Sequence, residues 1–254
     1  MKYASLGSGS RGNATVIEHQ QQCVLVDCGF SRKVTLQRLA QLEIDSQQLQ
    51  GVLVTHEHSD HAKGVQTLCE ALDIPFFASF GTAHKMEWLE HPLWRCIRGE
   101  QRLELIGLTI VPVVVPHDAQ EPLQYVVSNP QGYKLGILSD LGSLTPHIVE
   151  HYSGCHALQV EANHDPQLLQ VGPYPPSLRA RVAGNYGHLN NQQCAEFVAR
   201  VRWPGLKKVT AGHISEKNND RNLVRQLLAP VLSCAPTEVA LLEQDEVSPW
   251  TSLV

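Results

Sequence analysis

Residues 55–61, with the sequence THEHSDH, limit the folds open to this chain more than any other segment does. The β-type run VLVT ends at Thr55 and leads directly into three histidines and two carboxylates. Imidazole nitrogens and carboxylate oxygens in the pattern H-x-H-x-D-H are the donors that zinc and neighbouring divalent metals accept. The sequence therefore predicts that a strand delivers a group of metal ligands to its end.

The spacing inside this segment divides the ligands between two ions. If the chain stays extended, His56 and His58 point to the same side, because strand side chains alternate with a period of two. Asp60 and His61 follow the small polar Ser59, which can open a turn, and we expect them to project toward a second ion. The competing interpretation, a histidine-rich exposed loop without metal, leaves the ligands found later in the chain unexplained.

Further strand-like runs also end in a histidine or an aspartate. The run VVVP precedes His117, which we expect to be the third ligand of the first ion. KLGIL leads to Asp140, whose two oxygens can bridge both ions, and VTAG leads to His213, which would complete the second ion's ligands. Asp27 follows the run CVLV. An acid at the end of a strand can orient a metal-binding histidine by hydrogen bonding to it. Taken alone, however, Asp27 would more often be a turn residue.

The pattern of elements favours helices interleaved with mostly antiparallel strands, and hence sheet packed on sheet with helices outside. A helix is expected over residues 31–42 with Ser31 as its N-cap, and another over residues 62–72. Asn190 or Asn191 is expected to cap the helix that follows it.

Composition predicts one globular domain, residues 1–254. Hydrophobic residues make up 43% of the chain and charged residues 18%, which supplies a core and argues against disorder. The formal net charge is -5, so any surface that binds nucleic acid must be local.

The seven cysteines are scattered singly, without a C-x-x-C pair. This distribution argues against a disulfide framework and against a thiolate zinc site, and it fits a reducing compartment. Because no stretch is apolar for long enough to cross a bilayer, we expect a cytoplasmic protein without a membrane partner.

Together these residues resemble the metallo-β-lactamase fold superfamily over nearly the whole chain. The signature is His56, His58, Asp60 and His61, and the other motifs follow in order at Asp27, His117, Asp140 and His213. Within the superfamily, the chain is similar to the YycJ/WalJ-type subgroup in the segments SLGSGSRGN, PHDA, EANHD, GHLNN and GHIS, the last followed by NN at residues 218–219.

This resemblance implies an α+β fold, the αββα four-layer sandwich, with two divalent ions, Zn²⁺ or Mn²⁺. It implies phosphodiester hydrolysis, as an exonuclease on DNA, with RNA as a second nucleic-acid substrate to consider. We hypothesise that a hydroxide bridging the ions attacks phosphorus. One ion would be held by His56, His58, His117 and Asp140, and the other by Asp60, His61, Asp140 and His213.

The resemblance also implies which residues would act on the substrate. Asp60 would accept a hydrogen bond from the nucleophile as well as bind metal. His164 and His188 are candidates to bind phosphate or protonate the leaving oxygen, although each equally suits a histidine that caps a helix or bonds backbone. Arg179 and Arg181, in a locally basic stretch, are candidate contacts for the DNA backbone.

Other functions stay compatible with this ligand set. Glyoxalase-II-like thioesterases share it, and a small-molecule phosphodiesterase would need the same metals. A non-catalytic protein that binds metal and docks DNA is the alternative from another class. The sequence predicts no particular oligomeric state.

Overall fold

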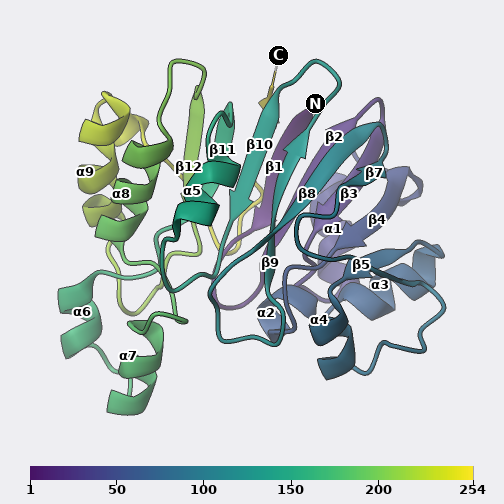
Figure 1. Cartoon of the computed structure of the whole chain (residues 1–254), viewed down its shortest axis with the longest axis horizontal. Helices are drawn as coiled ribbons and strands as arrows, with labels where there is room; N and C mark the ends of the chain where they lie inside the picture. Colours follow the sequence, from purple (N-terminus) through teal and green to yellow (C-terminus); the bar gives the residue numbers. More distant parts are fainter. Residues whose placement is uncertain (254) are drawn as a thin grey trace. The chain divides into compact units, whose positions relative to one another are not determined.

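The computed structural model describes residues 1–253, which form two compact units. Unit 1 comprises residues 1–114, 119–133 and 243–253, and unit 2 comprises residues 115–118 and 134–242. Figure 1 colours the elements of both units along the sequence. That the units form one domain stays a prediction.

Unit 1 contains a seven-stranded mixed sheet in the order β14-β1-β2-β3-β4-β5-β6. Its strands are β1 (Lys2–Gly7), β2 (Ala14–His19), β3 (Gln22–Val26), β4 (Leu49–Leu53), β5 (Phe76–Ala78), β6 (Trp94–Cys96) and β14 (Thr251–Ser252). Its helical segments are α1 (Arg32–Gln41), η1 (Ser46–Gln48), α2 (Ser59–Ala62), α3 (Val65–Leu72) and α4 (Phe80–Lys85). β1, β2 and β3 pair antiparallel, whereas β3, β4, β5 and β6 pair parallel.

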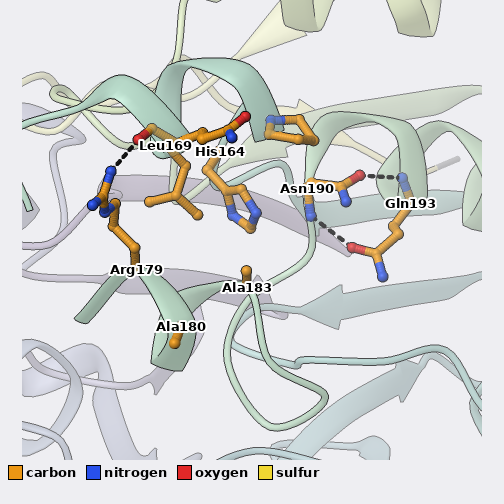
Figure 2. A pocket seen from close by; sticks show the side chains of 9 residues that line it. His164, Leu169, Arg179, Ala180, Ala183, Asn190 and Gln193 are labelled. Carbon is orange, nitrogen blue, oxygen red and sulfur yellow. Dashed lines mark hydrogen bonds between the residues drawn. The ribbon is translucent and has the colours of Figure 1, made fainter. Parts of the chain in front are cut away.

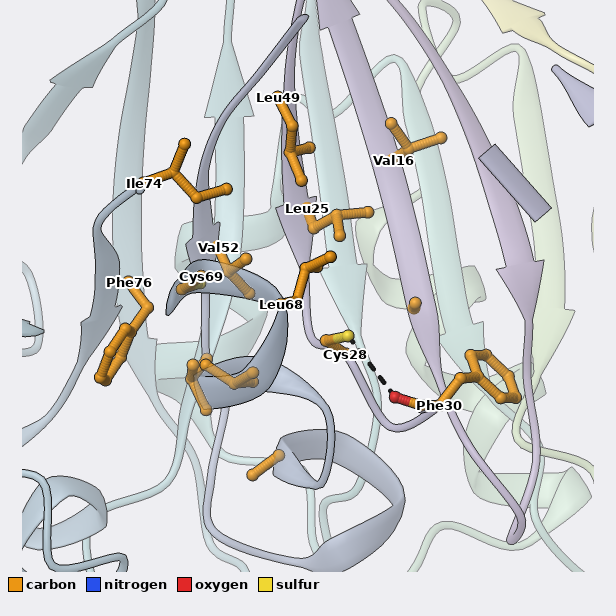
Figure 3. Packing of buried hydrophobic residues seen from close by; sticks show 14 of the residues in the cluster. Val16, Leu25, Cys28, Phe30, Leu49, Val52, Leu68, Cys69, Ile74 and Phe76 are labelled. Carbon is orange, nitrogen blue, oxygen red and sulfur yellow. Dashed lines mark hydrogen bonds between the residues drawn. The ribbon is translucent and has the colours of Figure 1, made fainter. Parts of the chain in front are cut away.

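Apolar side chains from these strands and helices form one core. Figure 3 shows Leu68 and Cys69 of α3 close to Leu25 of β3 and Val52 of β4, and all four are buried. Strands buried on both faces are nearly continuous runs of apolar residues, as the segment Cys23–Val26 of β3 is. Burial of each such side chain contributes about 1.5–3 kcal/mol, so this core holds the strand ends that carry the polar residues.

Unit 1 also contains an antiparallel meander of β7 (Leu103–Leu105), β8 (Leu108–Val114) and β9 (Leu123–Ser128). The Tyr125 hydroxyl of β9 donates a 2.6 Å hydrogen bond to the Val54 carbonyl. The backbone N–H of Leu123 donates to the Thr55 carbonyl at 2.9 Å. β9 therefore fixes the backbone that leads into residues 55–61.

Unit 2 is built on four parallel strands, β10 (Lys134–Leu138), β11 (Ala157–Glu161), β12 (Lys208–Gly212) and β13 (Ala240–Leu241). Its helical segments are α5 (Pro146–Tyr152), α6 (Pro166–Val171), α7 (Pro176–Val182), α8 (Asn191–Val201), α9 (Arg221–Leu232) and η2 (Pro236–Glu238). The ring of Tyr152 on α5 meets Phe197 of α8 edge-on at 5.9 Å between centroids. In Figure 1, α8 and α9 lie side by side.

Two sequence expectations about the elements are wrong. The strands are not mostly antiparallel, because helical connections carry the chain back to start each next strand in the same direction. The helix expected over residues 62–72 breaks at Gly64, whose N–H donates to the Cys28 carbonyl at 2.8 Å instead of continuing the helix. The caps expected at Ser31 and Asn190 are confirmed, since each side chain accepts a backbone N–H of the first turn.

Two further observations concern the chain's setting. All seven cysteines, which fall within residues 1–253, are free thiols, so the expectation of no disulfide framework is confirmed. Between residues 1 and 253, every helix is too short or too polar to cross a membrane.

Gly29 lies backbone to backbone against the segment that carries the predicted ligands. A Cβ on Gly29 would lie 1.7 Å from the Asp60 carbonyl oxygen and 2.7 Å from the Asn13 nitrogen. We therefore expect Gly29→Ala to lower the free energy of unfolding by about 3 kcal/mol, measured by urea denaturation. Gly132→Ala is the control: its Cβ meets nothing within 4 Å, and its φ of +85° costs about 1–2 kcal/mol. Equal losses in the two variants would contradict this packing argument.

Candidate metal centre

Unit 1 brings together the three histidines of residues 55–61. The chain leaves β4 at Leu53, and His58 occupies the N-cap of α2. The ring of His56 lies 4.5 Å from that of His58 and 4.3 Å from that of His61, measured between centroids. The Oδ2 of Asp60 lies 3.5 Å from the Nε2 of His61. Three imidazoles and one carboxylate therefore occupy one small volume, as the sequence predicts for residues 56–61.

Asp27 lies behind His61, where the sequence analysis expects it to orient a ligand. Its Oδ2 accepts a 2.7 Å hydrogen bond from the Nδ1 of His61, and its Oδ1 accepts from the Thr55 backbone N–H at 2.8 Å. With the proton on Nδ1, the lone pair of His61 lies on Nε2, which is the nitrogen a metal would bind. Burial raises the pKa of Asp27 above its ordinary value, while His61 and Thr55 oppose that shift.

Asn13 supports the same segment from the glycine-rich loop between β1 and β2. Its Nδ2 lies 3.1 Å from the Nε2 of His61 and 3.4 Å from the Oδ2 of Asp60. Its backbone N–H donates to the Asp60 carbonyl at 2.8 Å. The loop therefore buttresses the histidine segment, a role that the sequence analysis missed because glycines and serines alone indicate only a turn.

Unit 2 gathers a second polar cluster around the buried carboxylate of Glu161, the last residue of β11. Its Oε1 accepts hydrogen bonds from the Nδ1 atoms of His188 at 2.7 Å and His213 at 2.9 Å. Its Oε2 accepts the backbone N–H groups of Leu141 at 3.2 Å and Leu189 at 3.1 Å. Burial raises the pKa of a carboxyl group, but His188 and His213 outweigh it and hold the pKa of Glu161 below its usual value.

Asp140 joins this cluster, as its position after β10 predicts. Its carboxylate contacts the Nδ1 of His213 and lies 3.4 Å from the Nδ1 of His188. Ligand atoms of Asp140, Glu161, His188 and His213 all fall within 4.8 Å of one another. Burial by itself lowers the pKa of His188, but Glu161 and Asp140 reverse the effect and raise it to about 9.

His117 belongs to unit 2 and lies beside the same cluster. Its Nδ1 donates a 3.0 Å hydrogen bond to the Gly187 carbonyl, which leaves the lone pair on Nε2. Its ring centroid lies 5.3 Å from that of His188. Asp118, the next residue, pairs with Arg181 of α7 and lies 3.4 Å from the Nε2 of His117.

The hydrogen bonds described above for this cluster do not involve His164 or Arg179, the other two candidate residues. His164 is 2% exposed, and burial lowers its pKa to about 4, so its ring is neutral at neutral pH. Arg179, in the last turn of α7, donates from its guanidinium to the Gln170 carbonyl. Both line a pocket of unit 2.

Glu161 is the main site residue that sequence reasoning missed. The rule that found Asp140 and His213, a polar residue at a strand end, applies equally to Glu161. The segment EANHD contains several polar residues, and the sequence does not show which of them faces inward. The structure shows that Glu161 lies between His188 and His213.

The donors in both clusters fit a divalent cation. Imidazoles with one nitrogen held by a carboxylate or carbonyl, together with carboxylate oxygens, are ligands that such ions accept. The fold and these clusters define a metal-dependent hydrolase of the metallo-β-lactamase type, as the sequence predicts.

Comparison with known proteins agrees with this class. The family model of the beta-lactamase superfamily domain matches residues 22–214. The exodeoxyribonuclease YycJ of Bacillus anthracis is 31% identical over 239 residues, covering 91% of this chain and 89% of that protein. The exodeoxyribonuclease WalJ of Streptococcus pneumoniae is 30% identical over 248 residues, covering 94% of this chain and 91% of that protein. The chain therefore belongs to the beta-lactamase superfamily and, within it, to the YycJ/WalJ family.

A solved structure confirms the fold. The metallo-beta-lactamase fold protein YhfI from Bacillus subtilis superposes with a TM-score of 0.75 at 15% sequence identity. The match covers 97% of this chain and 98% of that one. The predicted α+β fold of this superfamily is therefore confirmed.

The hydrogen bond from His61 to Asp27 can be tested by removing one carboxylate oxygen. In Asp27→Asn we expect the affinity for Zn²⁺ or Mn²⁺ to fall about tenfold, because a residue that orients a metal-binding histidine typically contributes 10–100-fold. Competition with a chromogenic chelator measures the affinity. Asp45→Asn is the matched control, because Asp45 is exposed and only caps η1, a task that asparagine performs equally well. Wild-type affinity in Asp27→Asn would show that the bond does not support metal binding.

Proposed function

We propose that this protein is a metal-dependent exonuclease that degrades DNA. The observation that carries the proposal is similarity to exodeoxyribonucleases over 91% of a chain whose histidines and carboxylates gather in clusters suited to a metal ion. Phosphodiester cleavage needs charge stabilisation more than covalent chemistry from side chains, and clustered imidazoles and carboxylates that hold cations suit that task.

The proposal includes two divalent ions, Zn²⁺ or Mn²⁺. One ligand set would be His56, His58, His117 and Asp140, and the other Asp60, His61, Asp140 and His213. When bound, the ions would polarise the phosphate and acidify a water molecule. Because these sets draw on both units, the proposal requires residues 1–254 to act as one catalytic domain. Free thiols at all seven cysteines support a cytoplasmic location.

Buried carboxylates supply the rigidity that this chemistry needs. Asp27 fixes the ring of His61, and Glu161 fixes the rings of His188 and His213. A side chain that is held before the substrate arrives needs no reorganisation during the reaction. Asp60, beside His61, would accept a hydrogen bond from the attacking water.

We assign the proton transfer to the leaving oxygen to His188. Glu161 holds its Nδ1, so the ring can present only Nε2 to a substrate. The side chain is 21% exposed, whereas His164 is almost fully buried. His164 therefore suits a binding role better than an acid role.

Arg179 and Arg181 of α7 are proposed to contact the DNA backbone. The Arg181 side chain is 56% exposed although it pairs with Asp118. Arginine pairs well with phosphate because its planar guanidinium can donate two hydrogen bonds at once.

The central test is degradation of end-labelled DNA by metal-loaded wild type and by Asp60→Ala. We expect stepwise shortening of single- or double-stranded DNA by wild type, and a loss of about 100-fold or more in Asp60→Ala, because a proposed metal ligand is removed. Denaturing gels measure the rate and the polarity, and labelled RNA is a second substrate.

Asp45→Ala is the control for this test, since Asp45 is exposed and its side chain only caps η1. No degradation of DNA or RNA by the metal-loaded wild type, combined with hydrolysis of a short thioester or a small phosphodiester, would reject the nuclease in favour of those alternatives.

The role of His188 predicts a dependence on the leaving group. His188→Ala should slow DNA cleavage by about 100-fold but slow a p-nitrophenyl phosphodiester much less, because nitrophenolate leaves without a proton. His84→Ala, which removes an exposed histidine of α4, is the control. Equal losses on the two substrates would assign His188 a role other than proton donation.

A further inference from the structure

Unit 2 contains a pocket of about 620 Å³. It lies among α6, α7 and the start of α8, and its lining includes His164, Leu169, Arg179, Ala183, Asn190 and Gln193 (Figure 2). Ligand pockets in proteins commonly have volumes of 300–1,000 Å³. The pocket is therefore large enough for a group of nucleotide size.

The walls combine apolar surfaces with hydrogen-bond donors. Leu169 of α6 and the small side chains of Ala180 and Ala183 supply the apolar part. The side-chain oxygens of Asn190 and Gln193 accept each other's backbone N–H groups at 2.9 Å, as a capping box at the start of α8. Their NH₂ groups are the donors that this arrangement leaves for other partners.

His164 is the buried polar group of this pocket. Figure 2 shows its imidazole pointing into the space between α6, α7 and Asn190. Within residues 1–253, nothing forms a hydrogen bond with its buried Nδ1. A buried polar atom left in this state costs about 1–3 kcal/mol, so a ligand that bonds it would recover that free energy.

The charge of the lining selects the kind of ligand. Arg179 is the one charged residue among the lining residues that the structure describes, and the ring of His164 is neutral. A highly charged phosphate would find only one cation here. A flat, neutral group with hydrogen-bonding edges, next to a phosphate near Arg179, fits the lining better.

Besides burial, which dominates, Glu161 raises and His188 lowers the pKa of His164, so the pocket lies within electrostatic reach of the polar cluster. His164 forms an isolated parallel bridge with Asn190, and His188 precedes Asn190 by two residues. Glu161, which holds His188, is three residues before His164. A nucleotide next to the cleaved bond could therefore place its base in this pocket.

We propose that this pocket binds the unpaired base of a nucleotide at the end of the DNA substrate, with His164 and the amides of Asn190 and Gln193 contacting the base edge. This inference rests on the proposed function. A base can enter only after it has left the duplex, so the pocket favours single-stranded ends.

Equilibrium binding tests the pocket separately from catalysis. The probes are a fluorescein-labelled deoxythymidine decamer and the same decamer with abasic residues, which keeps every phosphate but removes the bases. With phosphorothioate linkages in both probes to prevent cleavage, fluorescence anisotropy gives a Kd of the metal-loaded protein for each probe. We expect wild type to prefer the base-bearing probe by about tenfold, since contacts to one base contribute about 1–3 kcal/mol.

Variants that fill the pocket should remove this preference. Ala183→Phe and, independently, Ala180→Phe should reduce the ratio of the two Kd values to about twofold or less, because the aromatic ring would occupy the space for the base. Ala199→Phe, at an exposed position on α8 outside the pocket, is the control and should keep the wild-type ratio.

Equal Kd values for the two probes in wild type would overturn the proposal, as would an unchanged ratio in both filled variants. The proposed function fails in a different way, by an absence of metal-dependent cleavage while the preference for bases persists. Cleavage without any preference for bases would retain the exonuclease and reject the pocket.

Discussion

The parallel alignment of neighbouring strands is the constraint on which the polar clusters depend. β10, β11 and β12 run in the same direction, with Leu138 opposite Val160 and Glu161 opposite Gly212. Their carboxyl ends therefore meet at one edge, where Asp140, Glu161 and His213 follow. β3 and β4 produce the same effect in unit 1 for Asp27 and Thr55.

Carboxylates buried at these edges make the clusters rigid, but they bring an electrostatic cost. A buried carboxylate is tolerated only when hydrogen bonds replace the lost hydration. Glu161 meets this condition through two imidazoles and two backbone amides, and Asp27 meets it through His61 and Thr55. Each network is therefore most stable when all its members are present.

The sequence predicts residues whose chemistry is local and misses features that depend on pairing between distant segments. The strand-end pattern by itself indicates Asp140 and His213, whereas only the family resemblance distinguishes Asp27 from a turn residue. It misses helix α6, although Asp165 followed by a proline is a good start signal and its side chain caps the helix. The parallel pairing of β3 to β6 and of β10 to β13 is not predicted, because hydrophobic alternation does not say which strand pairs with which. The pocket is not predictable from the sequence, because α6, α7 and α8 meet only in three dimensions.

Three of the strand-end residues have left-handed backbone: φ is 63° at Asp27, 49° at Asp140 and 50° at His213. Such conformations cost about 1–3 kcal/mol each and persist where the surroundings impose them. A cation that binds the folded chain and not the unfolded one offsets this strain through mass action. We therefore expect the lifetime of the folded protein to depend on the supply of a bound metal ion: without it, the strained strand ends would open more readily and expose the chain to proteolysis.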